Sequence, residues 1–321
     1  MTRITVLVPT YRRPACLKGC LQALARQRRK PDEVLVLVRE SDEATWAMLE
    51  SLPLDAGVRA VPVSQSGVVA SMNQGLSLAL GDLIAITDDD AEPHPDWLLR
   101  IERHFQDDPQ LGALGGRDCL FEAGVPVLGQ QATVGKLQWF GRHIGQHHLG
   151  FGSPRLVDVL KGVNQSYRRA AIDPIRFDTR LRAPGDGVEM HNEMTLCLAL
   201  KRAGWKVVYD PEVQVDHLQG PRVGGESRHR VSPETLKAEV HNETLAILEH
   251  LPPLNRLAFA AWAILVGTRR MPGLIQWLRL LPVEPLRAGR SLVATLAGRR
   301  GGWETWRRSR RGLQPLPQGA R

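Results

Sequence analysis

The alternation of apolar runs with helical segments in the N-terminal third of the sequence constrains the fold more than any other feature. Short buried strands are predicted at residues 4–8, 33–38 and 58–63, and helices at 15–27 and 43–52. A strand–helix–strand order of this kind is typical of parallel βαβ units with right-handed crossovers. We therefore predict an α/β fold, a mostly parallel sheet flanked by helices.

A fourth apolar run, residues 83–86, leads without a spacer into Asp88, Asp89 and Asp90. Adjacent carboxylates repel one another, so they are tolerated where a strand meets solvent and are useful where a divalent cation neutralises them. Oxygen-rich sites suit Mg²⁺ or Mn²⁺, which commonly also hold a substrate phosphate. Taken alone, the triplet fits a solvated acidic turn equally well. The following Pro-rich segment predicts a turn and then a helix start at Asp96.

The predicted parallel sheet brings three polar strand ends to one rim. Ligands of such sheets collect at the carboxyl ends of the strands, which here are residues 10–13, 39–42 and 88–90. This placement favours a binding site over a solvated turn. Residues 65–75 predict a turn into a helix whose N-terminal amides could face a diphosphate, although such turns are also common caps. Asn73 would lie one turn into that helix, facing the loop or the surface.

The middle of the chain gives weaker signals. Residues 111–116 predict a strand with a sharp turn, and we interpret the Gly- and His-rich stretch 129–152 as a mobile loop near the substrate. Its histidines lack the i, i+4 spacing of a metal-binding helix. A helix is predicted from about residue 189 to 203, followed by strands at 205–211 and 213–217. An acidic residue at the start of that helix can be a cap or a general base.

The net charge of +8 belongs to the C-terminal region. Residues 251–321 contain 13 Arg against two Glu, a charge of +11, so residues 1–250 carry −3. A helix is predicted at 235–250, and the 10-residue apolar run 257–266 is shorter than the roughly 18 residues of a spanning helix. Three interpretations compete: a membrane-surface anchor, a packing or dimerisation appendage, and a nucleic-acid patch. The first fits best and the last least, because no nucleic-acid-binding module accompanies the charge.

The cysteines and the N-terminus say little about function. The four cysteines are scattered without a CxxC pair, which suggests neither a zinc site nor a disulfide framework and fits a reducing cytosol. The first residues enter a strand directly, without the apolar region of a signal peptide, so we expect none.

Over about residues 1–220 the sequence resembles family 2 glycosyltransferases of the GT-A (Rossmann-like) fold. Single motifs are loose, but their ordered set is specific. The motifs are VPTYRRP at 8–14, the strand-end acid near Asp42, GVVASMNQG at 67–75, DDD at 88–90 followed by PDWL, GVNQSYRR at 162–169, and HNEMTLCLALKRAGWKVVYDPEVQVDH at 191–217.

The resemblance implies roles for individual positions. Glu193 would be the catalytic base. Relatives usually have two acidic residues at this position, whereas this sequence has Asn192-Glu193, so Glu193 would carry the role alone, with Glu189 and His191 as backups. Asp90 would bind the metal, and His217 would complete the metal or diphosphate site. Glu40 and Asp42 are the two candidates for the contact to the nucleotide base of the donor, and Asp88 would approach its ribose. The remaining donor-site residues would be Pro9, Thr10, Tyr11, Arg12, Asn73 and Asp89.

We therefore expect an inverting, Mn²⁺- or Mg²⁺-dependent glycosyltransferase. The donor would be a UDP-, dTDP- or GDP-sugar, and the acceptor a glycan or lipid-linked hydroxyl in cell-envelope polysaccharide synthesis. A GT-A domain (1–230) would precede a helical, Arg-rich region (231–321) that contacts the inner face of the cell membrane, in a cytoplasmic protein without a nucleic-acid partner. The alternatives are a non-catalytic scaffold on the same fold and a sugar nucleotidyltransferase, which would want a glycine-rich phosphate loop near residue 10.

Overall fold

The computed structural model describes residues 2–52, 57–184, 189–220 and 231–312, and these form two compact units. The sheet unit comprises residues 1–136, 144–177 and 196–223, and the helical unit comprises 137–143, 178–195 and 224–321. The predicted domain boundary at residue 230 falls in a stretch outside the described residues and stays a prediction.

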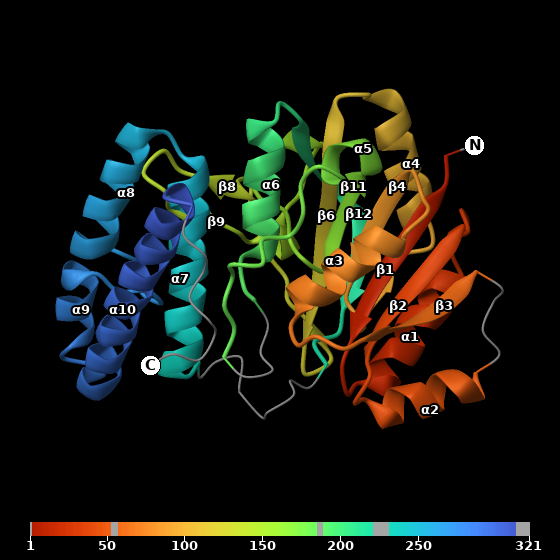
Figure 1. The fold of residues 1–321 in the computed structure, drawn as a ribbon, viewed down its shortest axis with the longest axis horizontal. Coiled ribbons are helices and arrows are strands. Elements are labelled where there is room, and N and C mark those ends of the chain that lie inside the picture. Colours follow the sequence, from red (N-terminus) through yellow and green to blue (C-terminus); the bar gives the residue numbers. More distant parts are fainter. Residues whose placement is uncertain (1, 53–56, 185–188, 221–230, 313–321) are drawn as a thin grey trace. The chain divides into compact units, whose positions relative to one another are not determined.

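The sheet unit is built around one mixed sheet with the strand order β10-β12-β6-β11-β4-β1-β2-β3 (Figure 1). Strands β3, β2, β1 and β4 are mutually parallel, as predicted, whereas β11 runs antiparallel to both β4 and β6. Two short strands, β5 and β7, pair with β12 and β6. The bounds are β1 Ile4–Thr10, β2 Glu33–Arg39, β3 Val58–Val63, β4 Leu83–Thr87, β5 Ala91–Pro93, β6 Leu111–Glu122, β7 Val125–Pro126, β10 Arg155–Leu156, β11 Asn164–Arg168 and β12 Lys206–His217.

The helices of the N-terminal half confirm the predicted alternation. They are α1 Pro14–Ala25, α2 Glu43–Ser51, α3 Val68–Leu78 and α4 Trp97–Asp107, with a short α5 at Arg169–Ile172. Gly67, which precedes α3, has a φ of 104°, a conformation that side-chain-bearing residues rarely adopt. The turn predicted at this position is therefore confirmed.

The core of the sheet unit forms because its central strands are apolar on both faces. Every residue of β4 is buried, and β1 and β2 are buried nearly throughout. Trp97 at the start of α4 is fully buried, and its indole N–H donates to Oδ1 of Asn164 at 2.9 Å. The Asn164 amide in turn donates to the carbonyl of Val213 at 2.9 Å. These bonds join α4, β11 and β12 behind the carboxyl end of β4.

Two predicted strand boundaries were wrong. The strand expected to turn sharply at residues 115–116 continues as β6 to Glu122, and the two strands expected at 205–211 and 213–217 form a single strand, β12. The register of β12 against β6 shifts between Asp210 and Gln214, so Pro211 lies within an irregularity instead of ending the strand. Gly116 has no room for a side chain, because a Cβ there would lie 1.7 Å from the carbonyl oxygen of Val213.

Two further expectations needed correction. Helix α6 spans Asn192–Arg202, so Glu189 and His191 precede it instead of opening it. The stretch 129–152 contains the paired strands β8 (Lys136–Leu137) and β9 (His143–Ile144) and a 3-10 turn at His147–Leu149. Within the motif at 162–169, residues 164–168 themselves form the buried strand β11.

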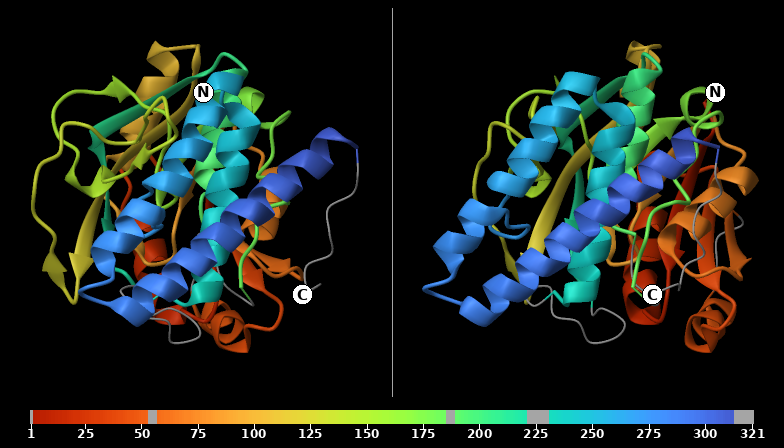
Figure 2. Two further views of the ribbon diagram at one scale, coloured as in Figure 1. Left: turned by 90° about the vertical axis from the view of Figure 1, so that its left-hand side faces the viewer. Right: turned by 60° about the vertical axis from the view of Figure 1, so that its left-hand side comes forward.

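The helical unit contains α7 Pro233–His250, α8 Pro253–Leu265, α9 Leu274–Leu280 and α10 Pro285–Arg310. The helix predicted at 235–250 is confirmed. Figure 2 shows α10 crossing α7, where Gly298 and Gly302 allow the two backbones to approach. Arg299 of α10 donates to Glu243 of α7 at 2.6 Å, and both side chains are buried. Among the described residues, no helix is both long and apolar enough to cross a membrane.

Candidate active site

The carboxyl ends of β1, β2 and β4 meet at one rim of the sheet, as the sequence predicted. The hydroxyl of Thr10 donates to Asp89 at 2.7 Å, and the Arg13 guanidinium pairs with both Asp89 and Asp90. The backbone N–H of Arg12 donates to Asp42 at 2.5 Å, which connects the ends of β1 and β2. The three strand ends therefore form one connected polar site.

Asp88, Asp90 and His217 form the group in this site that could hold a metal ion. Each offers one ligand atom, and these atoms all lie within 4.8 Å of one another. Oδ2 of Asp90 accepts from Arg13 and from the Gly220 amide, both at 2.9 Å, and Oδ1 lies 3.6 Å from Nε2 of His217. Two carboxylates and one imidazole fit a divalent cation such as Mn²⁺.

Asp118 stands behind His217 and was missed by the sequence analysis. It lies in the middle of β6, is 2% exposed, and approaches Nδ1 of His217 to 3.7 Å. Burial raises the pKa of Asp118, but the neighbouring His217, Lys161 and His147 outweigh burial, so its pKa lies below its usual value. The 3.7 Å separation is longer than a hydrogen bond, so Asp118 contributes its charge to this side of the His217 ring. No motif in the sequence marks this position.

Burial shapes the electrostatics of the acidic triplet. Burial, and then the charge of Asp90, raise the pKa of Asp88 to about 6. Burial raises the pKa of Asp89 to about 7, although Arg13 and Thr10 favour its charged form. Burial penalises the ionised form of these carboxyl groups, and a cation bound beside them would favour their ionisation. Asp89 is not a member of the candidate metal group, and its bonds hold the ends of β1 and β4 together.

The nucleotide-binding residues implied by the resemblance are distributed around the same rim. Tyr11 lies under the guanidinium groups of Arg12 and Arg39, whose carbons are 4.9 and 5.3 Å from the ring centroid. Asp42 is 2% exposed and also caps α2 by accepting from Thr45, both from its N–H at 3.2 Å and from its hydroxyl at 2.7 Å.

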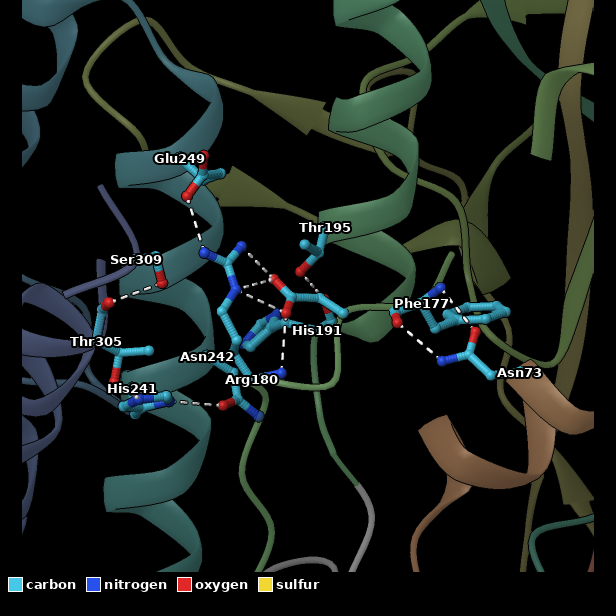
Figure 3. Close-up of polar contacts among 11 residues, drawn as sticks. Asn73, Phe177, Arg180, His191, Thr195, His241, Asn242, Glu249, Thr305 and Ser309 are labelled. Carbon is cyan, nitrogen blue, oxygen red and sulfur yellow. Dashed lines mark hydrogen bonds and ion pairs between the residues drawn. The ribbon is translucent and has the colours of Figure 1, made fainter. Parts of the chain in front are cut away.

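The other predicted donor-site residues differ in exposure and bonding. Glu40 is exposed, in contrast to the buried Asp42, and Pro9 is partly buried at the end of β1. Asn73, in α3, exchanges two hydrogen bonds with the backbone of Phe177, at 2.9 and 3.0 Å (Figure 3). Its amide therefore anchors the segment after α5.

Glu193 lies in the first turn of α6 and is partly exposed. His191, just before the helix, has a φ of 67°, and its carbonyl accepts from the Thr195 hydroxyl at 3.0 Å (Figure 3). Asn242 of α7 is fully buried and bonds the backbones on both sides of the preceding segment, at Arg182 and Met190. The segment that precedes α6 is thus held by hydrogen bonds within the helical unit.

Comparisons with known proteins identify related sequences. The model of the glycosyl transferase family 2 matches residues 5–173. Glucosyl-dolichyl phosphate glucuronosyltransferase of Haloferax volcanii is 24% identical over 222 residues, covering 67% of this chain and 69% of the relative. Hyaluronan synthase of Pasteurella multocida is 31% identical over 117 residues, covering 36% of this chain but 12% of the synthase.

Solved structures share the fold at low sequence identity. A mannosyltransferase from Pyrobaculum calidifontis, in complex with GDP-Man and Mn²⁺, has a TM-score of 0.54 and 17% identity, covering 94% of this chain and 87% of that one. TarS residues 1–349 from S. aureus, in complex with UDP-GlcNAc, has a TM-score of 0.56 and 14% identity, covering 98% and 93%. The fold is therefore that of GT-A glycosyltransferases. The family model covers more than half of the chain, and the chain belongs to glycosyl transferase family 2.

Proposed function

We propose that this glycosyltransferase is an inverting, metal-dependent enzyme that uses a nucleotide-diphospho-sugar donor. The observation that carries the proposal is the group of Asp88, Asp90 and His217 at the carboxyl ends of the strands, beside the rim residues Thr10 and Arg13. Solved neighbours of the same fold are complexes with GDP-Man and Mn²⁺ or with UDP-GlcNAc, which supports a donor of this class.

A divalent cation held by Asp90 and His217 would compensate the charge of the departing nucleoside diphosphate. The chain's own residues prepare that site: Arg13 and the Gly220 amide hold one oxygen of Asp90, and Asp118 supports His217. The donor's base would lie near Tyr11, with Glu40 as the exposed carboxylate available to it, because the Asp42 carboxylate caps α2 and bonds the Arg12 amide.

Glu193 is the proposed general base. A direct displacement at the sugar carbon needs a base within hydrogen-bond reach of the acceptor hydroxyl and no covalent enzyme intermediate. Glu193 is partly exposed in the first turn of α6, and the segment before it is held by Asn242. The buried Glu189 and the His191 ring remain the backup candidates.

The acceptor is proposed to be a glycan or lipid-linked hydroxyl of the cell envelope, at the inner face of the membrane. Helices α8, α9 and α10 expose many large apolar side chains between arginines, and such surfaces are attracted to anionic lipid. The exposed apolar residues are Leu254, Leu257, Ile264, Leu265, Leu274, Ile275, Leu278, Leu286, Val293, Leu296 and Trp303.

The test is a thermal-shift panel of UDP-, dTDP- and GDP-sugars, with and without Mn²⁺. A ligand bound by the native state alone stabilises it by about 2.7 kcal/mol at a concentration 100-fold above Kd. We expect one nucleotide to give a metal-dependent shift that Asp90→Asn abolishes. Asp96→Asn, a carboxylate that pairs with Arg100 outside the metal group, is the matched control and should keep the shift.

Glu193→Gln separates binding from catalysis. This variant should keep the metal-dependent shift and lose release of the nucleoside diphosphate in the presence of saccharide acceptors. If folded wild-type protein showed no shift with any donor, the scaffold interpretation would replace this one. If Glu193→Gln transferred sugar at the wild-type rate, the base would have to be another residue.

A further inference from the structure

A second cluster of metal-ligating side chains lies on the other side of β12 from His217. Successive residues of a strand point to opposite faces, so Asp216 faces away from the Asp88–Asp90–His217 group. Asp216 is in register with Cys119 of β6 on one side and with Glu92 of β5 on the other. His94 follows β5 directly, and its N–H donates to the carbonyl of Gln214 at 3.1 Å. Three separate segments therefore bring His94, Cys119 and Asp216 together.

The geometry of this cluster is that of a small coordination site. One ligand atom from each of His94, Cys119 and Asp216 lies within 4.8 Å of the other two. Nε2 of His94 is 3.0 Å from Oδ1 of Asp216. The side chains of His94 and Asp216 are 33% and 37% exposed, so an ion can reach them from solvent, while Cys119 is partly buried beside them.

We propose that His94, Cys119 and Asp216 form a second metal site, which takes Zn²⁺. Nitrogen, sulfur and carboxylate oxygen are the ligands of zinc in proteins, and three of them leave the fourth tetrahedral position to water. The sulfur distinguishes this site from the donor site, because Mg²⁺ and Mn²⁺ prefer oxygen and bind thiolate poorly. Binding releases the Cys119 thiol proton to solvent, and the thiolate and the Asp216 carboxylate then balance the two charges of the ion.

Metal binding at this site would stabilise β12, the strand that carries His217. Zinc would join the end of β5 to β6 and β12 one residue before His217, and it would hold that end of β12 in place. The proposal does not depend on the donor site, because it predicts metal binding by a different set of ligands. The scattered cysteines gave no zinc motif in the sequence, since the three ligands come from positions far apart in the chain.

Cobalt spectroscopy on the purified full chain tests the proposal. Co²⁺ replaces Zn²⁺ in tetrahedral sites, and a thiolate ligand adds a charge-transfer band in the near ultraviolet. The protein is first saturated with Mg²⁺ to occupy oxygen-rich sites. We expect one equivalent of Co²⁺ to give the band, one equivalent of Zn²⁺ to remove it, and Cys119→Ser to abolish it.

Cys16→Ser is the matched control, because Cys16 lies near Asp90, where a Cβ added to Gly220 would contact both residues. If the band persisted in Cys119→Ser or disappeared in Cys16→Ser, the sulfur ligand would belong to another site and the proposal would fail. Absence of the band in folded wild-type protein would also overturn it. His94→Gln, which keeps the thiol, should weaken Zn²⁺ binding at least tenfold in a chelator competition, and unchanged affinity would remove His94 from the site.

Discussion

The crossing of α7 and α10 predicts different effects of alanine at two neighbouring glycines of α10. A Cβ at Gly302 would lie 2.6 Å from the carbonyl oxygen of His241 and 2.8 Å from Cβ of Thr244. A Cβ at Gly301 would meet one atom, Cδ2 of the His241 ring, at an ordinary 3.4 Å. Alanine in a helix interior gains about 1 kcal/mol over glycine at either position.

The magnitude follows from these distances. Carbon atoms pack best at about 3.5–4.0 Å, so Gly302→Ala must move α10 away from the α7 backbone, and overpacking of this kind costs about 1–3 kcal/mol. Because both variants share the propensity gain, their difference in unfolding free energy isolates the packing cost. We expect Gly301→Ala to stabilise the helical unit and Gly302→Ala to be less stable than it by about 1–3 kcal/mol.

Hydrogen exchange followed by mass spectrometry measures this difference locally. Exchange of the α7 and α10 amides should be roughly 5- to 150-fold faster in Gly302→Ala than in Gly301→Ala, while peptides from β1 and β4 should exchange equally in both variants. If the two variants exchanged alike, α10 would have room at Gly302 and the described close approach would be wrong.

Other perturbations test the sheet unit and the membrane proposal. Burial lowers the pKa of His147 from 6.5 to about 4, so its contribution to stability is complete above pH 6.5 and is lost as the pH falls towards 4. Between pH 7.5 and pH 5, the unfolding free energy measured in urea should fall by about 2 kcal/mol less in His147→Gln than in wild type. An equal fall in both proteins would contradict a buried neutral ring. Asn164→Leu should cost about 3 kcal/mol in urea unfolding, because it leaves the Trp97 N–H and a strand carbonyl unpaired; a loss below about 0.5 kcal/mol would mean that neither group is isolated from water. Finally, the full chain should sediment with anionic but not neutral lipid vesicles, and the double variant Leu257→Gln and Leu278→Gln should lose this binding; equal binding by the variant would place the contact elsewhere.

The local patterns of the sequence were sufficient for the N-terminal half of the sheet. Strands such as 83–86 are apolar at every position, and the helices between them have apolar residues at helical spacing, so neighbouring residues alone specify each element. The parallel arrangement then follows from the connections, and it brings Thr10 and Asp88–Asp90 to one rim. The contacts of Asp89 with Thr10 and Arg13 confirm that placement.

Tertiary structure decided what local patterns could not express. The glycines at 115 and 116 suggested a turn, but Gly116 is needed because the backbone of Val213 approaches it too closely for any side chain. Pro211 suggested a strand end, but a register shift accommodates it within β12. In both cases the residue's role depends on a strand about a hundred positions away in the chain, which no window of the sequence contains.

The candidate site divides in the same way. The acidic triplet was recognisable from the sequence, because three adjacent carboxylates at a strand end are costly without a ligand. The resemblance to a known family added His217 and Glu193. Asp118 and the cluster of His94, Cys119 and Asp216 remained invisible, since each is a single ordinary residue whose neighbours come from other strands. The sequence by itself determined the elements and the acidic rim. Only the pairing of β5, β6 and β12 decided which side chains meet, because strand register sets both the partner and the face of every residue.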